Sequence, residues 1–395
     1  MVDNSQKIAV LDVFRFIGAV IVVLVHYELI FGQFIVWGAL GTTALSWFFM
    51  VSGFVLSYVY PSLSGWAATK QFYKFRIIRI YPAYAFAILV SSTFVWLSYL
   101  SVGEAFFVEA HRPFQITYDL PEVKDTSFFL IATLRHYLFT QSISSIETLK
   151  LLFNGPLWSL VLEAYFYLCF PLFLILLRKV TTYKRVFAVF IAGYLMQFGL
   201  IAFFLPEAEY YDLATLNVPV YTNPIIRFVE FVFGMLIYRL FALSGIDKDK
   251  GKVNLIPLLI SIVVYLFVIW FGENYVPYQY SSFFVAIPAV AVLVYCMLNL
   301  QWYPKGATLK LCELLGGLSY IIYCLHWPFM EMVQYSNLLP ESWPYQLHLP
   351  VLASILIGIS YLVYHFLEFP LRRKMYKLLI KKNKECNGAC KSSLL

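Results

Sequence analysis

The chain has 395 residues, of which 61% are hydrophobic and 13% charged, and its formal net charge is +7. A soluble domain carries roughly 45–50% apolar and about 25% charged residues, so this composition excludes an ordinary soluble protein and makes the lipid bilayer the expected solvent. The positive charge does not indicate a nucleic-acid partner, because the basic residues lie mostly in short segments between apolar runs. The spacing of the six cysteines is typical of neither a disulfide framework nor a zinc site, and no metal is expected.

Ten apolar runs are long enough to cross a bilayer, which takes about 20 mostly apolar residues. The expected spans are residues 8–31, 38–60, 80–101, 156–177, 186–205, 223–242, 255–271, 281–300, 311–333 and 351–369. A further run, 127–140, is too short and contains Arg135 and His136, so we expect a re-entrant or interfacial segment. The predicted fold class is all-α, a polytopic transmembrane helical bundle.

The distribution of basic residues predicts the orientation of this bundle. With ten spans and a cytoplasmic N-terminus, only five of the 29 Lys and Arg residues lie toward the outer side: Arg112, Lys124, Arg135, Lys150 and Arg227. If 127–140 also crossed, the basic cluster at 178–185 would lie outside and the positive-inside bias would be lost. We therefore expect a multi-pass protein of the plasma (inner) membrane with both termini in the cytoplasm.

The domain organisation is expected to be simple. One transmembrane domain covers 1–370 and includes an outer loop at 102–155, and a basic cytoplasmic tail covers 371–395. The first apolar run is too long for a cleavable signal peptide, and we expect no second catalytic domain after the tail.

The first span contains two ionisable residues, Arg15 and His26, eleven positions apart. At 100° per residue they share one face of a helix, separated by about 16 Å along its axis. One face thus presents a cation near the inner surface and a titratable base near the outer one. Taken singly, Arg15 is also explained as a snorkelling anchor and His26 as a packing histidine.

The second span carries Ser52 and Gly53, a small pair that typically permits close helix packing. The segment that follows contains Arg76 and Arg79, three positions apart at the expected start of the third span and hence on one face. Two guanidinium groups on the cytoplasmic side suit bidentate binding of phosphates. Ordinary positive-inside charge explains them equally well.

Two further polar residues are predicted in the outer half of the membrane. Glu163 lies about two turns below the outer surface in the fourth span, near Trp158 and Tyr165, and His326 lies at a similar depth in the ninth. A carboxylate at this depth needs a partner or a water-filled cavity. Either of two partners would meet this need of Glu163: a cation in a structural ion pair, or a histidine at similar depth.

Two charge groups have a purely structural interpretation. Arg227 and Glu230 are three positions apart in the sixth span and are expected to pair with each other. Glu368, beside Arg372 and Arg373 near the inner surface, is expected to belong to an interfacial salt-bridge group.

Seven stretches, taken in order along the chain, resemble the acyltransferase-3 family of polytopic membrane acyltransferases: LDVFRFIGAVIVVLVHY, WFFMVSGFVLS, KFRIIRIYPAY, LWSLVLEAYFYLCFP, IIRFVEFVFGM, LSYIIYCLHWP and FLEFPLRR. That family modifies lipopolysaccharide, peptidoglycan, exopolysaccharide and some small glycosides. The resemblance implies an Arg-x10-His pair at Arg15 and His26. It also implies an Arg-x-x-Arg pair at Arg76 and Arg79. A Trp-Ser-Leu…Glu stretch falls on Trp158, Ser159 and Glu163. It implies acetyl-CoA as the usual donor.

The function expected from this resemblance is a membrane O-acyltransferase. It would move an acyl group, acetyl in the usual case, from cytoplasmic acyl-CoA to a hydroxyl of a cell-surface or lipid-linked glycan. His26 would act as general base or carry the acyl group transiently, with Glu163 holding its tautomer and His326 as a second proton donor or acceptor. The donor-binding residues would be Arg15, Arg76 and Arg79, and the cavity residues Ser52, Trp158, Ser159 and Tyr165.

A secondary transporter or polysaccharide exporter is the main alternative, since ten spans with intramembrane charges suit that class too. It predicts discontinuous helices in paired halves and no use of acyl-CoA. The sequence has no paired Gly/Pro-broken spans in corresponding positions. A structural scaffold, the third alternative, leaves His26 and Glu163 unexplained.

Overall fold

Long apolar helices make up the computed structural model, which describes residues 9–32, 38–102, 126–143, 150–204, 218–244, 253–277, 280–300, 302–340 and 342–386. Within these ranges the chain forms helices and no strands, which confirms the all-α prediction. The longer helices are α1 (Ala9–Phe31), α2 (Gly38–Val59), α3 (Gly65–Val102), α5 (Thr126–Tyr137), α7 (Trp158–Leu176), α8 (Tyr183–Phe204), α10 (Pro224–Leu243), α11 (Ile256–Tyr275), α13 (Ala286–Leu298), α14 (Gly306–Ser336), α15 (Tyr345–Val363) and α16 (Phe369–Cys386).

Nine helical segments of the described chain are long and apolar enough to cross a membrane. Nine of the ten predicted spans correspond to these segments. The tenth predicted span, 223–242, corresponds to the helix α10. It is not among the nine segments because it contains three charged residues, Arg227, Glu230 and Arg239. Two of these charges, Arg227 and Glu230, are fully buried in the bundle and pair with each other.

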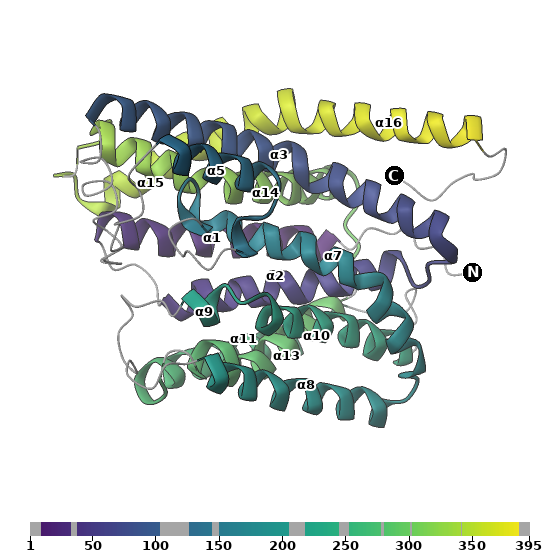
Figure 1. Ribbon diagram of the computed structural model, residues 1–395. Helices are drawn as coiled ribbons and strands as arrows, with labels where there is room; N and C mark the ends of the chain where they lie inside the picture. Colours follow the sequence, from purple (N-terminus) through teal and green to yellow (C-terminus); the bar gives the residue numbers. More distant parts are fainter. Residues whose placement is uncertain are drawn as a thin grey trace.

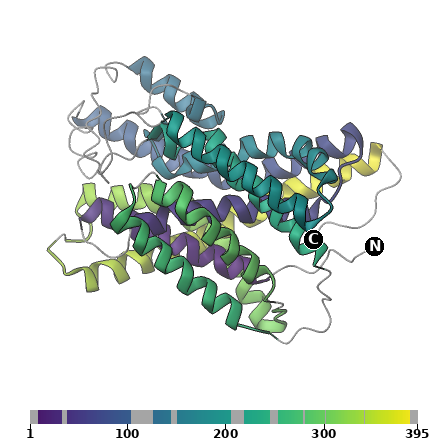
Figure 2. The same cartoon turned by 90° about the horizontal axis from the view of Figure 1, so that it is seen from below.

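The helices run side by side along one general direction, with α1, α2 and α7 in the middle (Figure 1). Figure 2 shows the same bundle from below, with neighbouring helices tilted relative to one another. In α2, 83% of the most apolar stretch is buried, against 17% in α8. The centre of the bundle is therefore built on α2, whereas α8 and α11 present apolar side chains to the surroundings, as expected of lipid-facing helices.

The backbones of α2 and α10 approach each other closely at two glycines. A methyl group added to Gly53 would collide with the carbonyl of Phe231, and one added to Gly234 would collide with the carbonyl of Met50. The small pair Ser52 and Gly53 thus permits close helix packing, as predicted.

The third span begins earlier than the sequence analysis placed it. Arg76 and Arg79 lie inside α3, which begins at Gly65, rather than at the start of a helix. A hydropathy criterion detects only the apolar part of a helix that continues beyond the bilayer with polar, helix-favouring residues. Their spacing of three still places both arginines on one face.

The short segment 127–140 corresponds to α5 and the turn after it. At 12 residues α5 is too short to span, and its buried residues are Phe129, Ala132 and His136. It packs on α3, where the hydroxyl of Tyr84 donates to the carbonyl of His136 over 2.8 Å. Most of the outer loop, residues 103–125 and 144–149, lies outside the described residues.

The last span continues into the basic segment without a break. A π-helical turn, Tyr364–Glu368, joins α15 to α16, and α16 lies beside the first half of α3 (Figure 1). There the ring of Tyr376 packs on Phe75 with centroids 5.5 Å apart. The first part of the predicted tail is therefore a helix docked on the bundle, and residues 387–395 lie outside the described chain.

Candidate active site

Two histidines from opposite ends of the sequence meet inside the bundle. Nδ1 of His26 on α1 lies 2.8 Å from Nε2 of His326 on α14, with the two rings stacked at 5.0 Å between centroids. His326 is fully buried, whereas His26 keeps part of its surface accessible. Trp327 packs edge-on against His26 with centroids 5.2 Å apart. The structure thus brings together two of the three predicted acid/base residues.

The surroundings of His326 fix the proton positions of this pair. Nδ1 of His326 lies 2.8 Å from the carbonyl of Tyr323 and 3.2 Å from that of Ile322. A carbonyl oxygen only accepts, so Nδ1 of His326 carries the proton and its Nε2 is an acceptor in the neutral ring. His26 must then donate through Nδ1, which leaves Nε2 of His26 with a free lone pair. This is the tautomer that a general base or nucleophile requires.

Tyr323, whose carbonyl orients His326, is itself held at the beginning of α7 through its side-chain hydroxyl. The hydroxyls of Ser159 and Tyr323 lie 2.5 Å apart and 3.0 and 2.8 Å from the carbonyl of Pro156. Because each hydroxyl has a single proton, one of them donates to the other, which in turn donates to this carbonyl. This network ties the beginning of α7 to the turn of α14 that precedes His326. The predicted cavity residue Ser159 is fully engaged in this contact.

Glu163 on α7 does not pair with His26. One of its carboxylate oxygens, Oε1, accepts hydrogen bonds from Ser52 and Tyr167, each at 2.6 Å. The position that we expected Glu163 to occupy beside the imidazole is taken by His326. Glu163 instead interacts electrostatically with Arg15. Tyr167 was missed, although its spacing of four from Glu163 predicts contact on one helix face.

Arg15 and Arg76 approach this carboxylate from the other end of the bundle, here called the arginine end after Arg15, Arg76 and Arg79. Arg15 pairs loosely with Asp12 at 3.8 Å and keeps 28% of its side chain accessible. Arg76 lies over the rings of Tyr60 and Tyr167 at 5.5 and 5.9 Å. In the described chain Arg76 has no carboxylate partner, and its buried Nε has no hydrogen-bond acceptor.

Arg79 is the third residue of the arginine end and differs from Arg76 in having a carboxylate partner. Its guanidinium lies 3.6 Å from Glu368 and 5.1 Å over the ring of Tyr320. The sequence predicted a salt-bridge group of Glu368 with Arg372 and Arg373, and Glu368 does pair with Arg372 at 2.8 Å, but the contact with Arg79 was not predicted. The arginine end therefore carries more positive than negative charge, as an anion-binding region requires.

The remaining predicted site residues are structural in their contacts. Trp158 lies against Arg227, 5.8 Å from ring to guanidinium. Arg227 pairs with Glu230 at 2.9 Å, and both are fully buried, as the sequence analysis expected of this pair. Tyr165 donates to the carbonyl of Phe139 over 2.6 Å and so anchors the turn after α5.

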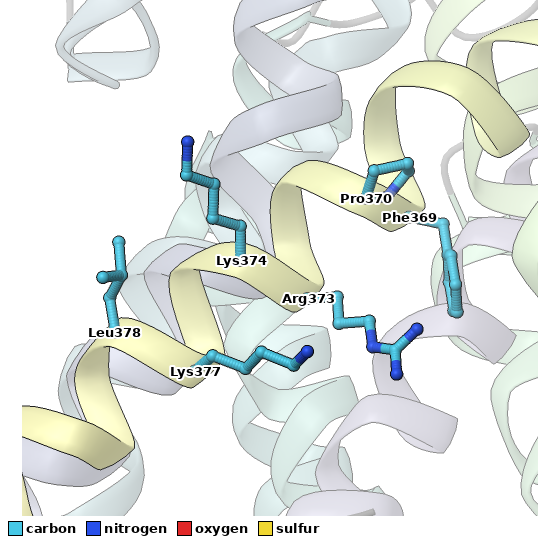
Figure 3. Close-up of a pocket in the computed structure, with 6 residues that line it drawn as sticks. All are labelled: Phe369, Pro370, Arg373, Lys374, Lys377 and Leu378. Carbon is cyan, nitrogen blue, oxygen red and sulfur yellow. The ribbon is translucent and has the colours of Figure 1, made fainter.

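A groove of about 470 Å³ lies along α16 (Figure 3). Its lining residues are Phe369, Pro370, Arg373, Lys374, Lys377 and Leu378. Figure 3 shows Arg373 and Lys377 extending to one side of the helix. These cations lie outside the arginine end and make no ion pair with Glu368.

Comparison with known proteins identifies the class to which this site belongs. The acyltransferase domain of the acyltransferase-3 family matches residues 8–365, nearly the whole chain. The chain therefore belongs to this family, and it is a multi-pass membrane protein of the O-acyltransferase class. The resemblance that the sequence motifs indicated is confirmed.

Individual relatives are distant. The chain is 22% identical to the O-acetyltransferase OatA of Staphylococcus aureus and 24% identical to the peptidoglycan O-acetyltransferase OatA of Listeria monocytogenes, each over 93% of this chain. It spans only 57% and 56% of the length of these two relatives. An uncharacterized protein of Haemophilus influenzae is 25% identical over 63% of this chain and 93% of its own length. No solved structure matches the chain.

Proposed function

We propose that this protein transfers an acyl group, acetyl in the usual case, from cytoplasmic acyl-CoA to a hydroxyl of a cell-surface or lipid-linked glycan. The observation that carries the proposal is the 2.8 Å contact of Nδ1 of His26 with Nε2 of His326, from which we infer that Nε2 of His26 carries a free lone pair. In this proposal the arginine end lies toward the cytoplasm of the plasma (inner) membrane, with both termini on that side.

The acyl-CoA donor suits the arginine end for two reasons: the charge there is positive, and a buried guanidinium N–H group there has no acceptor in the described chain. The nucleotide part of acyl-CoA carries phosphates, which guanidinium groups bind strongly. Arg15, with its accessible surface, and Arg76, with an unpartnered buried Nε, are the residues proposed to hold it, together with Arg79. The pantetheine arm then extends past Glu163 and Ser52 toward His26.

The chemical step follows from the protonation of the histidine pair. Nε2 of His26 accepts the proton of the acceptor hydroxyl while that oxygen attacks the thioester carbonyl. The new C–O bond forms, the C–S bond breaks, and the departing CoA sulfur takes the proton back from His26. The buried Nε2 of His326 accepts a hydrogen bond from Nδ1 of His26 throughout and stabilises its transient positive charge.

Reconstitution of the purified protein in vesicles tests this proposal. Transfer of labelled acetyl from acetyl-CoA to a glycan acceptor, with peptidoglycan fragments as the first acceptor because of the Listeria relative, is the expected result. His26→Ala should abolish transfer, and His365→Ala, an exposed histidine on the π-helical turn, should not. Full transfer by a folded His26→Ala protein would refute the role of His26.

A further inference from the structure

The carboxylate of Glu368 joins two helices at the arginine end. Glu368 is the last residue of the π-helical turn between α15 and α16, and its side chain is only 2% exposed. The same oxygen, Oε1, lies 2.8 Å from the guanidinium of Arg372 and 3.6 Å from that of Arg79. A π-turn inserts a residue into the helix and shifts which side chains face inward, and such turns are frequent at functional sites.

The exposure of the three groups shows how they are layered. The carboxylate is buried, whereas Arg79 and Arg372 keep 30% and 20% of their side chains accessible. Each guanidinium has five N–H donors, and the carboxylate occupies only part of them. Glu368 is therefore more deeply buried than the two guanidiniums, both of which keep accessible surface, and the three side chains together carry a net positive charge.

Such an arrangement suits an anion with more than one phosphate. Two guanidiniums without a carboxylate between them would repel each other and separate. Because both pair with one carboxylate oxygen, the two guanidiniums are held near each other and keep N–H donors that the carboxylate does not occupy. The ring of Tyr320, 5.1 Å from Arg79, further restricts where that guanidinium can lie.

We propose that Glu368 is a positioning residue that holds Arg79 and Arg372 together as a binding site for the phosphates of the acyl donor. The inference rests on the proposed function and deepens it, because it adds Arg372 and Glu368 to the donor site. It assigns the C-terminal helix α16 a role in substrate binding beyond anchoring the chain. Arg373, the neighbouring cation, lines the groove along α16 (Figure 3). We do not assign it to this site because Glu368 pairs with Arg79 and Arg372 instead.

Steady-state kinetics with acetyl-CoA as the varied substrate separate this role from a purely structural one. Glu368→Gln and Arg372→Gln should each raise KM for acetyl-CoA about fivefold or more, with kcat close to that of the unaltered protein, because binding and not chemistry is impaired. Arg373→Gln is the matched control, since it removes the same charge one position along the helix and should leave KM unchanged. Glu368→Asp, which keeps the charge, should restore part of the affinity.

Four results would overturn the inference. The first two are an unchanged or lowered KM in a folded Glu368→Gln protein and an unchanged KM in Arg372→Gln. The third is a rise in KM in Arg373→Gln equal to that in Arg372→Gln. The fourth is a fall in kcat without a rise in KM in the Glu368→Gln or Arg372→Gln protein. If Glu368→Gln does not fold, Arg372→Gln against Arg373→Gln decides the question. Failure of the unaltered protein to use acetyl-CoA at all would instead remove the proposed donor, and this inference with it.

Discussion

Nδ1 of His26 and Nε2 of His326 lie 2.8 Å apart, although the two residues are separated by 300 positions in the chain. The contact joins α1 and α14, which pack along each other through the middle of the bundle. It couples a partly accessible imidazole to a fully buried one, whose own proton is held by the carbonyl of Tyr323. The two rings therefore act as a unit, in which the buried ring orients the accessible ring.

Replacing His326 should impair catalysis rather than donor binding. In His326→Ala, Nδ1 of His26 loses its acceptor, so the ring is free to rotate and to take the other tautomer. We expect kcat to fall about a hundredfold or more, with KM for acyl-CoA nearly unchanged, because the arginine end is untouched. Initial rates with varied acyl-CoA measure both constants. A kcat within threefold of the unaltered protein would contradict the orienting role.

The hydrogen bonds to Glu163 should be energetically coupled. Ser52→Ala and Tyr167→Phe each remove one donor from Oε1 of the same carboxylate. A hydrogen bond to a charged group contributes about 1.5–3 kcal/mol, so each variant should lower the free energy of unfolding by an amount of that order. Because both donors share one acceptor atom, the double variant should not show the sum of the single effects. Denaturant unfolding of the four proteins checks this, and strict additivity would contradict it.

Local spacing predicted the parts of the site that lie on single helices. The shared face of Arg15 and His26 and the pairing of Arg227 with Glu230 follow from the period of an α-helix, which any stretch of sequence reveals. The contacts of His26 with His326, and of Arg79 with Glu368, depend on which helices pack together, and spacing does not determine that. Glu163 was predicted as the partner of His26 only because the two residues lie at a similar depth in the membrane. Depth in the membrane does not determine which side of α7 faces α1.

Hydropathy located the spans well but misplaced the beginning of α3. The bilayer-facing part of a helix is apolar, whereas its continuation in water is polar, so the apolar run ends before the helix does. The same reason explains the basic tail, part of which is the helix α16. Both features lie at the arginine end, where α3 and α16 meet through Phe75 and Tyr376.

The buried pair of Arg227 and Glu230 should be important for stability and not for donor binding. Both side chains are fully buried, and Glu230 also accepts from Gln197 over 3.3 Å. Removing one partner leaves an uncompensated charge, which costs about 3–5 kcal/mol. Glu230→Ala should therefore lower the melting temperature strongly. The double variant Arg227→Met, Glu230→Leu, which removes both charges, should recover most of the loss, and thermal unfolding in detergent compares the three proteins.

Close packing of α2 on α10 should make Gly53 intolerant of any side chain. The atom that a methyl group at Gly53 would meet is a backbone carbonyl, that of Phe231, which cannot move without displacing α10. Overpacking of this kind costs typically about 1–3 kcal/mol, and more where backbone must shift. Gly53→Val should thus lower thermal stability sharply and, because Ser52 is adjacent, disturb its hydrogen bond to Glu163 and lower activity. Gly199→Val is the matched control, since nothing lies within 4 Å of a methyl group placed there on α8. Equal melting temperatures for the two variants would show that α2 and α10 are not in close contact.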